Sequence, residues 1–246
     1  MSRFFVEEKN IKEDRIYITD KDDVKHLSKV LRHRIGDVVE ISDNREFEYE
    51  IELTEIAADM ACGSIISKRT FEREPYHRVT LYQGIPKQGK MELIIQKTVE
   101  LGVDRIIPVF TERTVVQDKG NFGKKTERWQ KIADEAVKQC RRGVIPAIEN
   151  SISFEDVAEH MKSNDINIFC YEDENKTALK EILRSNDIEG CKKIGLIIGP
   201  EGGFSEKECS FITEAGALSA SLGKTILRVE TASVAALAML MYELEQ

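Results

Sequence analysis

An apolar run followed by a glycine-rich loop constrains the fold most. Residues 194–198 read Ile-Gly-Leu-Ile-Ile, and the loop Gly-Pro-Glu-Gly-Gly-Phe-Ser follows directly at 199–205. A short run without polar alternation is typical of a central parallel strand that is buried on both faces. Ser205 can cap the next helix, with Glu208 three residues on completing a capping box. The segment therefore predicts a strand of a parallel sheet, followed by a loop and then by a helix.

Strands and helices alternate from Pro75 to the end of the chain. The patterns predict strands over 78–82, 105–110, 166–171, 193–198 and 217–222, and helices over 90–101, 126–141, 205–215 and 231–244. In the second of these helices, Trp129 and the apolar residues that follow it recur at the spacing of one helix face. Such alternation implies an α/β domain with a mostly parallel sheet.

The residues before Pro75 follow a different pattern. They predict short strands over 15–19, 37–41, 48–53 and 63–66 and one helix over 22–31. Short strands separated by glycine and polar turns suggest a small β-barrel. With Glu72–Pro75 as a linker, we expect two domains, residues 1–72 and 73–246.

Length and composition narrow the class of protein. The chain has 246 residues, 41% of them hydrophobic, which is enough for a real core. Its start lacks the apolar run of a signal peptide, and its longest apolar stretch, 232–240, is too short to span a bilayer. The five cysteines show no C-x-x-C spacing, so neither a disulfide framework nor a zinc site is indicated. We expect a cytoplasmic protein with no membrane and no metal.

The distribution of charge matters more than its sum. The net charge is −8, which by itself argues against a nucleic-acid partner. Residues 113–142, however, carry nine Lys or Arg against four acids. A solvated helix face is the ordinary interpretation of such a segment, and an RNA-binding surface is the alternative.

Two segments can carry chemistry. The loop at 199–205 lies where open α/β sheets bind ligands, although a tight structural turn would use the same glycines. No G-x-G-x-x-G occurs, and Gly223-Lys224-Thr225 is no phosphate-binding loop because Leu218 stands where that motif needs glycine. The second segment, Arg-Val-Glu-Thr-Ala at 228–232, precedes the last predicted helix. Thr231 could simply be its N-cap.

Together these segments resemble a known family. The loop at 199–205 followed by Leu-Gly-Lys-Thr-Ile-Leu-Arg-Val-Glu-Thr-Ala at 222–232 is similar to the bacterial 16S ribosomal RNA uridine-N3 methyltransferases of the SPOUT superfamily. The similarity continues in Arg3-Phe4-Phe5, around His26 to Asp37, and at many positions between 87 and 146. Lys224 stands where arginine is more usual, and Cys140 where serine is usual.

The resemblance implies an architecture and an activity. It implies a C-terminal trefoil-knotted SPOUT (α/β knot) methyltransferase domain with a mostly parallel sheet, a small N-terminal PUA-like β-barrel for RNA binding, and a homodimer. It further implies an enzyme of ribosome biogenesis and rRNA processing. That enzyme would use S-adenosyl-L-methionine to methylate N3 of a specific uridine in 16S rRNA of the small ribosomal subunit.

The resemblance also implies site residues. The donor site would consist of Tyr171, Glu172, Ile198, Gly199, Pro200, Gly202, Gly203, Leu222, Gly223, Ile226, Leu227, Thr231 and Ala232. The RNA contacts would be Arg3, His26, Arg32, Lys90, Arg113, Arg128, Arg141 and Arg142. Arg141 and Arg142 are expected to be exposed on the helix face opposite Trp129.

Methylation of uridine N3 defines what the catalytic residues must do. This weakly acidic nitrogen has to lose its proton, and the resulting anion needs a cation near O2 or O4. Arg228 is the candidate cation, unless it only pairs with Glu201 or Glu230 to shape the loop. Glu201, Glu230 and Thr231 are candidates for proton handling or orientation, and the sequence leaves the choice among them open.

Two other functions compete. A non-catalytic RNA-binding or ribosome-assembly protein could use the barrel and the basic segment equally well, but it would not need to keep the glycine loop. A SPOUT enzyme acting on transfer RNA is disfavoured by the N-terminal domain and by the Glu-Thr-Ala sequence at 230–232.

Overall fold

The chain forms two compact units. The computed structural model describes residues 3–117, 120, 122–174, 177–185, 188 and 190–245. Unit 1 contains the residues up to Glu74 together with Val137–Ile145, and unit 2 contains Pro75–Ala136 together with the residues from Pro146 onwards. Unit 1 therefore includes a segment from far along the chain.

Unit 1 is built on a five-stranded sheet in the order β1-β3-β4-β5-β2. Only β1 and β3 pair in parallel among these neighbours. Its elements are β1 (Arg3–Phe5), the 3-10 turn η1 (Glu8–Asn10), β2 (Arg15–Ile18), α1 (Lys21–Lys25), the π-turn η2 (His26–Val30), β3 (Val38–Ser42), β4 (Phe47–Ile56) and β5 (Ala61–Thr70).

The apolar residues of these strands explain the sheet of unit 1. Ile16, Ile41 and Ile51 are fully buried in one core cluster with Leu27 of the π-turn. The helix predicted over 22–31 begins where Asp20 accepts hydrogen bonds from the backbone N–H groups of the second and third residues after it, and it continues as the π-turn.

Side chains of the N-terminal strands and turns bind the backbone of segment 137–145. The Glu74 carboxylate accepts hydrogen bonds from the N–H groups of Gly143 (2.6 Å) and Val144 (3.1 Å). Asn44 Oδ1 accepts from the N–H of Ile145, and Ser42 Oγ donates to the Gly143 carbonyl. These contacts join the segment to unit 1.

Two arginines that were expected at an RNA surface are used in these contacts. The Arg3 side chain is 9% exposed, pairs with Glu48 and donates to the carbonyls of Arg141 (3.0 Å) and Arg142 (3.1 Å). Arg142 is buried and pairs with Glu74 at 2.9 Å. The predicted exposure of Arg142 is therefore wrong, whereas Arg141 is exposed.

Unit 2 contains a sheet in which every described pair of strands is parallel, in the order β12-β10-β11-β6-β7-β8, with β9 also pairing with β7. Its strands are β6 (Arg78–Gly84), β7 (Arg105–Phe110), β8 (Ala147–Ile148), β9 (Ile152–Ser153), β10 (Ile166–Cys170), β11 (Lys193–Ile198) and β12 (Leu218–Ala220). Its helices are α2 (Lys90–Glu100), α3 (Phe122–Cys140), α4 (Phe154–Met161), α5 (Leu179–Leu183), α6 (Glu206–Glu214) and α7 (Val229–Leu244). The last turn of α3 belongs to unit 1.

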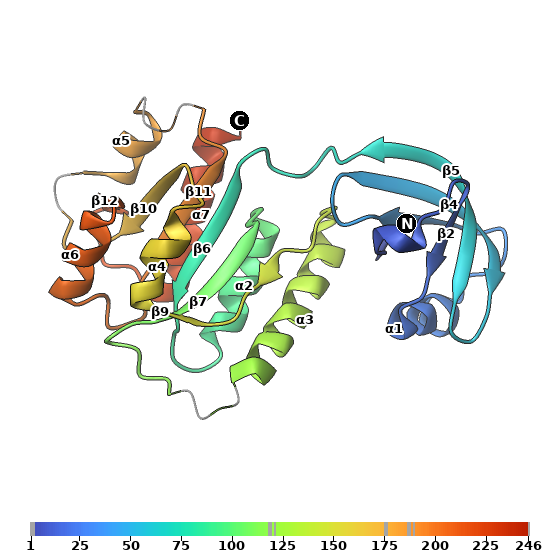
Figure 1. The fold of residues 1–246 in the computed structure, drawn as a ribbon, viewed down its shortest axis with the longest axis horizontal. Coiled ribbons are helices and arrows are strands. Elements are labelled where there is room, and N and C mark those ends of the chain that lie inside the picture. The colour runs from blue at the N-terminus through green and yellow to red at the C-terminus, as the bar shows by residue number, and fades with distance from the viewer. Residues whose placement is uncertain are drawn as a thin grey trace. The chain divides into compact units, whose positions relative to one another are not determined.

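Helices cover both faces of this sheet, as the apolar strands predict. In Figure 1, α4 lies in front of the sheet and α7 behind it. Phe154 and Val157 of α4 share a core with Ile212 of α6 and with residues of β7, β10 and β11. On α7, Leu237 and Leu240 are fully buried, and this helix contacts α2 and α5.

The described helices differ from the predicted ones at their ends. Helix α3 begins at Phe122 rather than at residue 126 and stops at Cys140 because Arg141 adopts a positive φ of 61°. Helix α7 begins at Val229, so Thr231 is not its N-cap. The cap residue is Arg228, whose backbone is extended and whose carbonyl accepts the N–H of Ala232 at 2.8 Å.

The sequence analysis did not predict two of the helices and three of the strands, namely α4, α5, β1, β8 and β9.

In the described part of the chain, no helix has both the length and the apolar character needed to cross a membrane. The knot that the resemblance implies stays a prediction. Lys119 and Asp118 of the basic segment lie outside the described residues.

The buried Arg142–Glu74 pair generates a prediction about stability. We expect Arg142→Ala to lower the free energy of unfolding by about 2–4 kcal/mol, because it leaves a largely buried carboxylate without its cation. Arg45→Ala is the control in the same unit, since Arg45 pairs with Glu8 at the surface and both side chains are more than 70% exposed. Urea unfolding of the two variants measures the difference, and equal losses would contradict the structural role.

Candidate functional site

Three neighbouring strands end at one edge of the sheet in unit 2. The strands β12, β10 and β11 are adjacent and parallel. The segments that follow them, 171–174, 199–205 and 221–228, therefore meet beyond the same edge. This is the place where parallel α/β sheets bind ligands.

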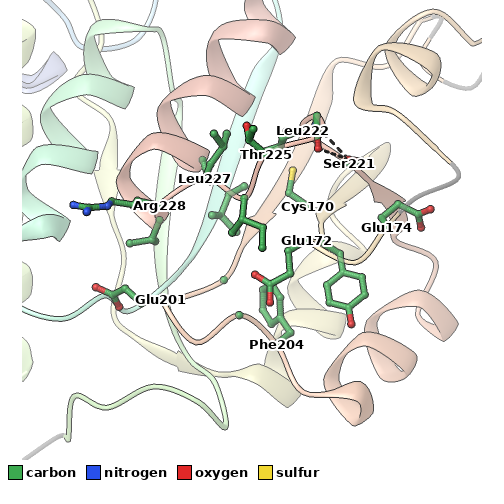
Figure 2. A pocket seen from close by; sticks show the side chains of 18 of the residues that line it. Cys170, Glu172, Glu174, Glu201, Phe204, Ser221, Leu222, Thr225, Leu227 and Arg228 are labelled. Carbon is green, nitrogen blue, oxygen red and sulfur yellow. Dashed lines mark hydrogen bonds between the residues drawn. The ribbon is translucent and has the colours of Figure 1, made fainter.

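A cavity of about 450 Å³ lies among these segments (Figure 2). Its size falls within the roughly 300–1,000 Å³ that is usual for small-molecule sites. It is lined by Lys90, Cys170, Tyr171, Glu172, Glu174, Ile198, Gly199, Pro200, Glu201, Gly203, Phe204, Ser221, Leu222, Gly223, Lys224, Thr225, Ile226, Leu227, Arg228, Val229 and Ala232. Figure 2 shows Arg228 and Glu201 at one end and Glu174 and Ser221 at the other.

Most of the expected donor-site residues line this cavity. The exceptions are Gly202, whose carbonyl accepts a hydrogen bond from Arg113, and Thr231, which is exposed in the first turn of α7. Of the expected catalytic residues, Arg228 and Glu201 line the cavity, whereas Glu230 and Thr231 do not. The structure thus brings together residues from three separate chain segments.

The backbone of segment 222–227 is open to a ligand. Among its N–H groups, all of which are described, only that of Gly223 donates within the protein, to Ser221 Oγ at 3.3 Å. Unpaired backbone groups at a cavity wall are suited to the edge of a heterocycle, because they present donors and acceptors at fixed positions. This wall could therefore hold a flat polar ring.

Glycines leave room at the cavity floor. Gly203 has a positive φ of 64°, and a Cβ built there would come within 2.7 Å of a Glu172 carboxylate oxygen. A Cβ on Gly199 would lie 2.9 Å from the Phe204 ring. The glycine loop thus needs these residues both for its backbone conformation and for its close packing.

Charged side chains form a cluster at the end of the cavity near Arg228. Lys90 Nζ, on the first residue of α2, lies 3.1 Å from Glu201 Oε1 and 3.2 Å from Glu230 Oε2. Glu201 also accepts hydrogen bonds from the N–H of Lys87 at 3.1 Å. One lysine therefore pairs with two carboxylates, which leaves one negative charge uncompensated by the lysine.

Arg228 is available for a ligand. In the described part of the chain, its guanidinium makes no ion pair and no hydrogen bond, and the residue is exposed. The alternative that Arg228 pairs with Glu201 or Glu230 to shape the loop is not what the structure shows, because Lys90 holds both acids. A cation without a protein partner at the mouth of a cavity can bind an anionic or carbonyl oxygen.

The carboxylates of this cluster are weak bases. Burial raises the pKa of Glu201, but hydrogen bonds from its own backbone N–H and from Lys87, with the Lys90 charge, bring the pKa below its ordinary value. A hydrogen bond from its own N–H is the largest cause that lowers the pKa of Glu230, and Lys90 and Arg228 lower it further against burial. Both groups therefore stay ionised.

Two other titratable groups at the cavity stay protonated near neutral pH. Burial raises the pKa of the Cys170 thiol to about 12. Burial and the hydrogen bond to Asp173 raise the pKa of Tyr171 to about 12. Neither group can act as a thiolate or phenolate base or nucleophile at neutral pH.

The expected RNA contacts are distributed over both units. His26, Arg32 and Arg141 are exposed in unit 1, and Arg32 adopts a positive φ of 57°. In unit 2, Arg128 pairs with Glu92 at 2.7 Å while remaining 68% exposed. Lys90 belongs to the cavity cluster, and Arg113 binds the glycine loop.

The sequence prediction missed several cavity residues. These are Cys170, Glu174, Phe204, Ser221, Lys224, Thr225 and Val229. The position of most of these residues in the sequence could have indicated them, because they end a strand, lie in the glycine loop or lie between two segments that were predicted to line the site. Among the described residues, no three His, Cys, Asp or Glu side chains are arranged to hold a metal ion.

Comparison with known proteins assigns the family. A family model described as an RNA methyltransferase domain matches residues 72–241, and one described as an RNA methyltransferase PUA domain matches residues 18–62. The chain belongs to this RNA methyltransferase family. The expected α/β fold and N-terminal PUA domain are confirmed.

Relatives of the family cover almost the whole chain. A protein of Bacillus subtilis named ribosomal RNA small subunit methyltransferase E is 33% identical over 252 aligned positions, covering 100% of this chain and 98% of that protein. A protein of the same name from Buchnera aphidicola is 36% identical, with 94% of each chain covered. The crystal structure of the Neisseria gonorrhoeae protein of that name, bound to S-adenosyl methionine, is 30% identical, with a TM-score of 0.85 over 98% of this chain and 97% of that one.

The Lys90 cluster generates a prediction about pH. Because the pKa values of Glu201 and Glu230 in the folded protein lie below the ordinary glutamate value of 4.5, their ion pairs stabilise the fold above about that pH. This contribution is lost as the pH falls through the lowered values. We expect Lys90→Met to be less stable than the wild type at pH 7, with the difference shrinking below about pH 4.5.

Urea unfolding at a series of pH values measures this difference. Lys162→Met is the control, because Lys162 pairs with Glu159 on the surface, where both side chains are more than 70% exposed. A difference for Lys90→Met that stays constant from neutral to acidic pH would show that the lysine acts through packing alone.

Proposed function

We propose that this chain is an S-adenosyl-L-methionine-dependent methyltransferase that methylates N3 of a specific uridine in 16S rRNA of the small ribosomal subunit. The observation that carries the proposal is the cavity at the ends of β10, β11 and β12. It combines an open backbone wall at 222–227 with an unpaired Arg228 at its mouth. Family membership and the relatives' names support the reaction and the RNA class.

The cavity residues fit S-adenosylmethionine. The open amides of segment 222–227 suit the adenine edge, and apolar side chains such as Ile198 and Leu227 suit its faces. The acids Glu172 and Glu174 suit the cationic part of this ligand. When bound, S-adenosylmethionine supplies the electrophilic methyl group.

Arg228 has the leading catalytic role in this proposal. Its guanidinium would hold a uridine carbonyl oxygen and stabilise the anion that forms when N3 loses its proton. It is suited to this role because the two nearby acids already pair with Lys90. Because Arg228 makes no ion pair among the described residues, it can bind the base without first breaking one.

The acidic residues are better suited to orientation than to proton removal. The lowered pKa values of Glu201 and Glu230 make them weak bases. Glu230 Oε2 is buried beside Lys90 Nζ at 3.2 Å, and Glu230 does not line the cavity. We assign Glu201 to orienting the base, Glu230 to holding Lys90 beside Glu201, and Thr231 to the start of α7.

The proposal includes partners and location. His26, Arg32, Arg128 and Arg141 remain as RNA contacts, since all four are exposed. A homodimer is supported by apolar side chains on α7 and α2, where Met239, Tyr242 and Leu93 are 44–65% exposed. We place the enzyme in the cytoplasm, with its ribosomal substrate, and retain the knotted chain course as part of the proposal.

The competing functions have less support. A non-catalytic RNA-binding protein would have no use for a cavity of this size with an open backbone wall. An enzyme acting on transfer RNA would not explain why relatives that cover the full chain are named for the small ribosomal subunit.

Methylation of purified RNA tests the function directly. The full chain is incubated with labelled S-adenosylmethionine and either small ribosomal subunits or transfer RNA, and the modified nucleotide is mapped by mass spectrometry. We expect one N3-methyluridine in 16S rRNA. Labelling of transfer RNA alone, or binding of RNA without any methyl transfer, would replace the proposal with one of its two competitors.

Arg228→Lys tests the catalytic assignment. The variant keeps the charge but loses the planar fork, so we expect the turnover number to fall at least about tenfold, or roughly 1.4 kcal/mol of transition-state stabilisation. Donor affinity and melting temperature should stay near the wild-type values. Arg184→Lys is the control, because Arg184 pairs with Glu243 and does not line the cavity. Normal turnover, or joint loss of donor binding and stability, would make Arg228 structural.

A further inference from the structure

The Glu208 carboxylate is shared between two loops of unit 2. Its Oε2 accepts the N–H of Ser205 at 2.8 Å, which is one half of the capping box that begins α6. Its Oε1 accepts the N–H of Glu112 at 2.8 Å, in the segment that follows β7. The residue is only 7% exposed. A helix cap thus also binds a loop 96 residues earlier in the chain.

The next residue of that segment makes a second bond to the glycine loop. Arg113 NH1 donates to the Gly202 carbonyl at 2.8 Å. A Cβ on Gly202 would lie 3.1 Å from the Arg113 Cβ, so the two segments are also closely packed. The glycine loop is therefore held both at its middle and at its junction with α6.

The segment that makes both bonds has a fixed conformation of its own. Thr114 N–H donates to the Thr111 carbonyl at 3.0 Å, and Thr111 N–H donates to Thr114 Oγ1 at 3.0 Å. Thr111 follows directly after β7, in the sheet. The two bonds thus connect the glycine loop to a turn that the central sheet positions.

We propose that Glu208 and Arg113 are positioning residues that hold the loop 199–205 in the conformation that receives the methyl donor. The inference rests on the proposed function of the cavity. Neither side chain lines the cavity, so both act through the loop. The sequence resemblance implied an RNA contact for Arg113, and the observed bond to Gly202 assigns it a different role.

Glu208 suits this role because of its chemistry. An ionised carboxylate presents acceptors on both oxygens, whereas a glutamine presents one acceptor and one donor. Glu208→Gln must therefore place an NH₂ group against one of the two backbone N–H donors. Either the helix cap or the bond to Glu112 is lost, while size and shape are kept.

The first experiment titrates S-adenosylmethionine into the full chain by calorimetry. We expect Glu208→Gln and Arg113→Met each to raise the dissociation constant by about five- to tenfold, the effect of losing one or two hydrogen bonds that order a loop. Arg113→Lys should recover part of this loss, since lysine can still donate to the Gly202 carbonyl. In the double variant Glu208→Gln/Arg113→Met, the dissociation constant should rise by less than the product of the two single increases, because both bonds hold the same loop.

Asp156→Asn is the matched control for the helix cap. Asp156 closes the same kind of capping box with Ser153 at the start of α4, and it is exposed and distant in sequence from the glycine loop. Its variant should lower the melting temperature without changing donor affinity. If Asp156→Asn weakens donor binding as much as Glu208→Gln does, Glu208 is only a stabilising cap.

Two further measurements separate this inference from its alternatives. Hydrogen exchange of the peptide covering 199–205, without donor, should be faster in Glu208→Gln and Arg113→Met than in the wild type and in Asp156→Asn. This readout holds even if the wild type binds no S-adenosylmethionine, an outcome that would overturn the proposed function instead. If Arg113 instead contacts RNA, Arg113→Met should lower the salt slope of RNA binding by about one unit and leave hydrogen exchange and donor affinity unchanged. That result would overturn the inference.

Discussion

The parallel pairing of β12, β10 and β11 is the constraint on which the site depends. Parallel strands that are neighbours present their carboxyl ends at one edge, so the segments after them meet whatever their distance in sequence. The apolar sequence of β11 makes this possible, because a strand buried on both faces can only lie inside such a sheet. The glycine loop, the open backbone at 222–227 and the segment after β10 are brought together by this one arrangement.

The charge arrangement at the cavity follows from the position of one lysine. Lys90 is the first residue of α2, and it reaches acids from two other elements, the glycine loop and α7. With both acids paired to Lys90, Arg228 makes no ion pair among the described residues. The difference between the paired cation, Lys90, and the unpaired one, Arg228, therefore depends on three segments, and no single motif contains it.

Local signals in the sequence predicted the parts that depend on local physics. The capping box of Ser205 and Glu208 and the buried strand before it could be predicted because their causes lie within a few residues. The same kind of signal was present in Ser153 and Asp156, and attention to it would have predicted α4. The predicted start of α7 was wrong because the N-cap is Arg228, whose side chain makes no capping hydrogen bond. Such a cap does not need Ser, Thr, Asp or Asn, so the sequence does not indicate it. The burial of Arg142 could not be predicted, since its partner Glu74 lies far away in the chain.

The contacts of Glu74 also bear on whether the N-terminal unit can be cut from the rest of the chain. A fragment ending at residue 74 keeps all five strands of the unit 1 sheet. It removes, however, the backbone groups that satisfy Glu74, Asn44 and Ser42, and the carbonyls that receive Arg3. Such a fragment would expose several polar groups that the intact chain pairs internally. The N-terminal unit is thus completed by a piece of chain translated later, so during synthesis it cannot reach its final form until the polypeptide has passed residue 145.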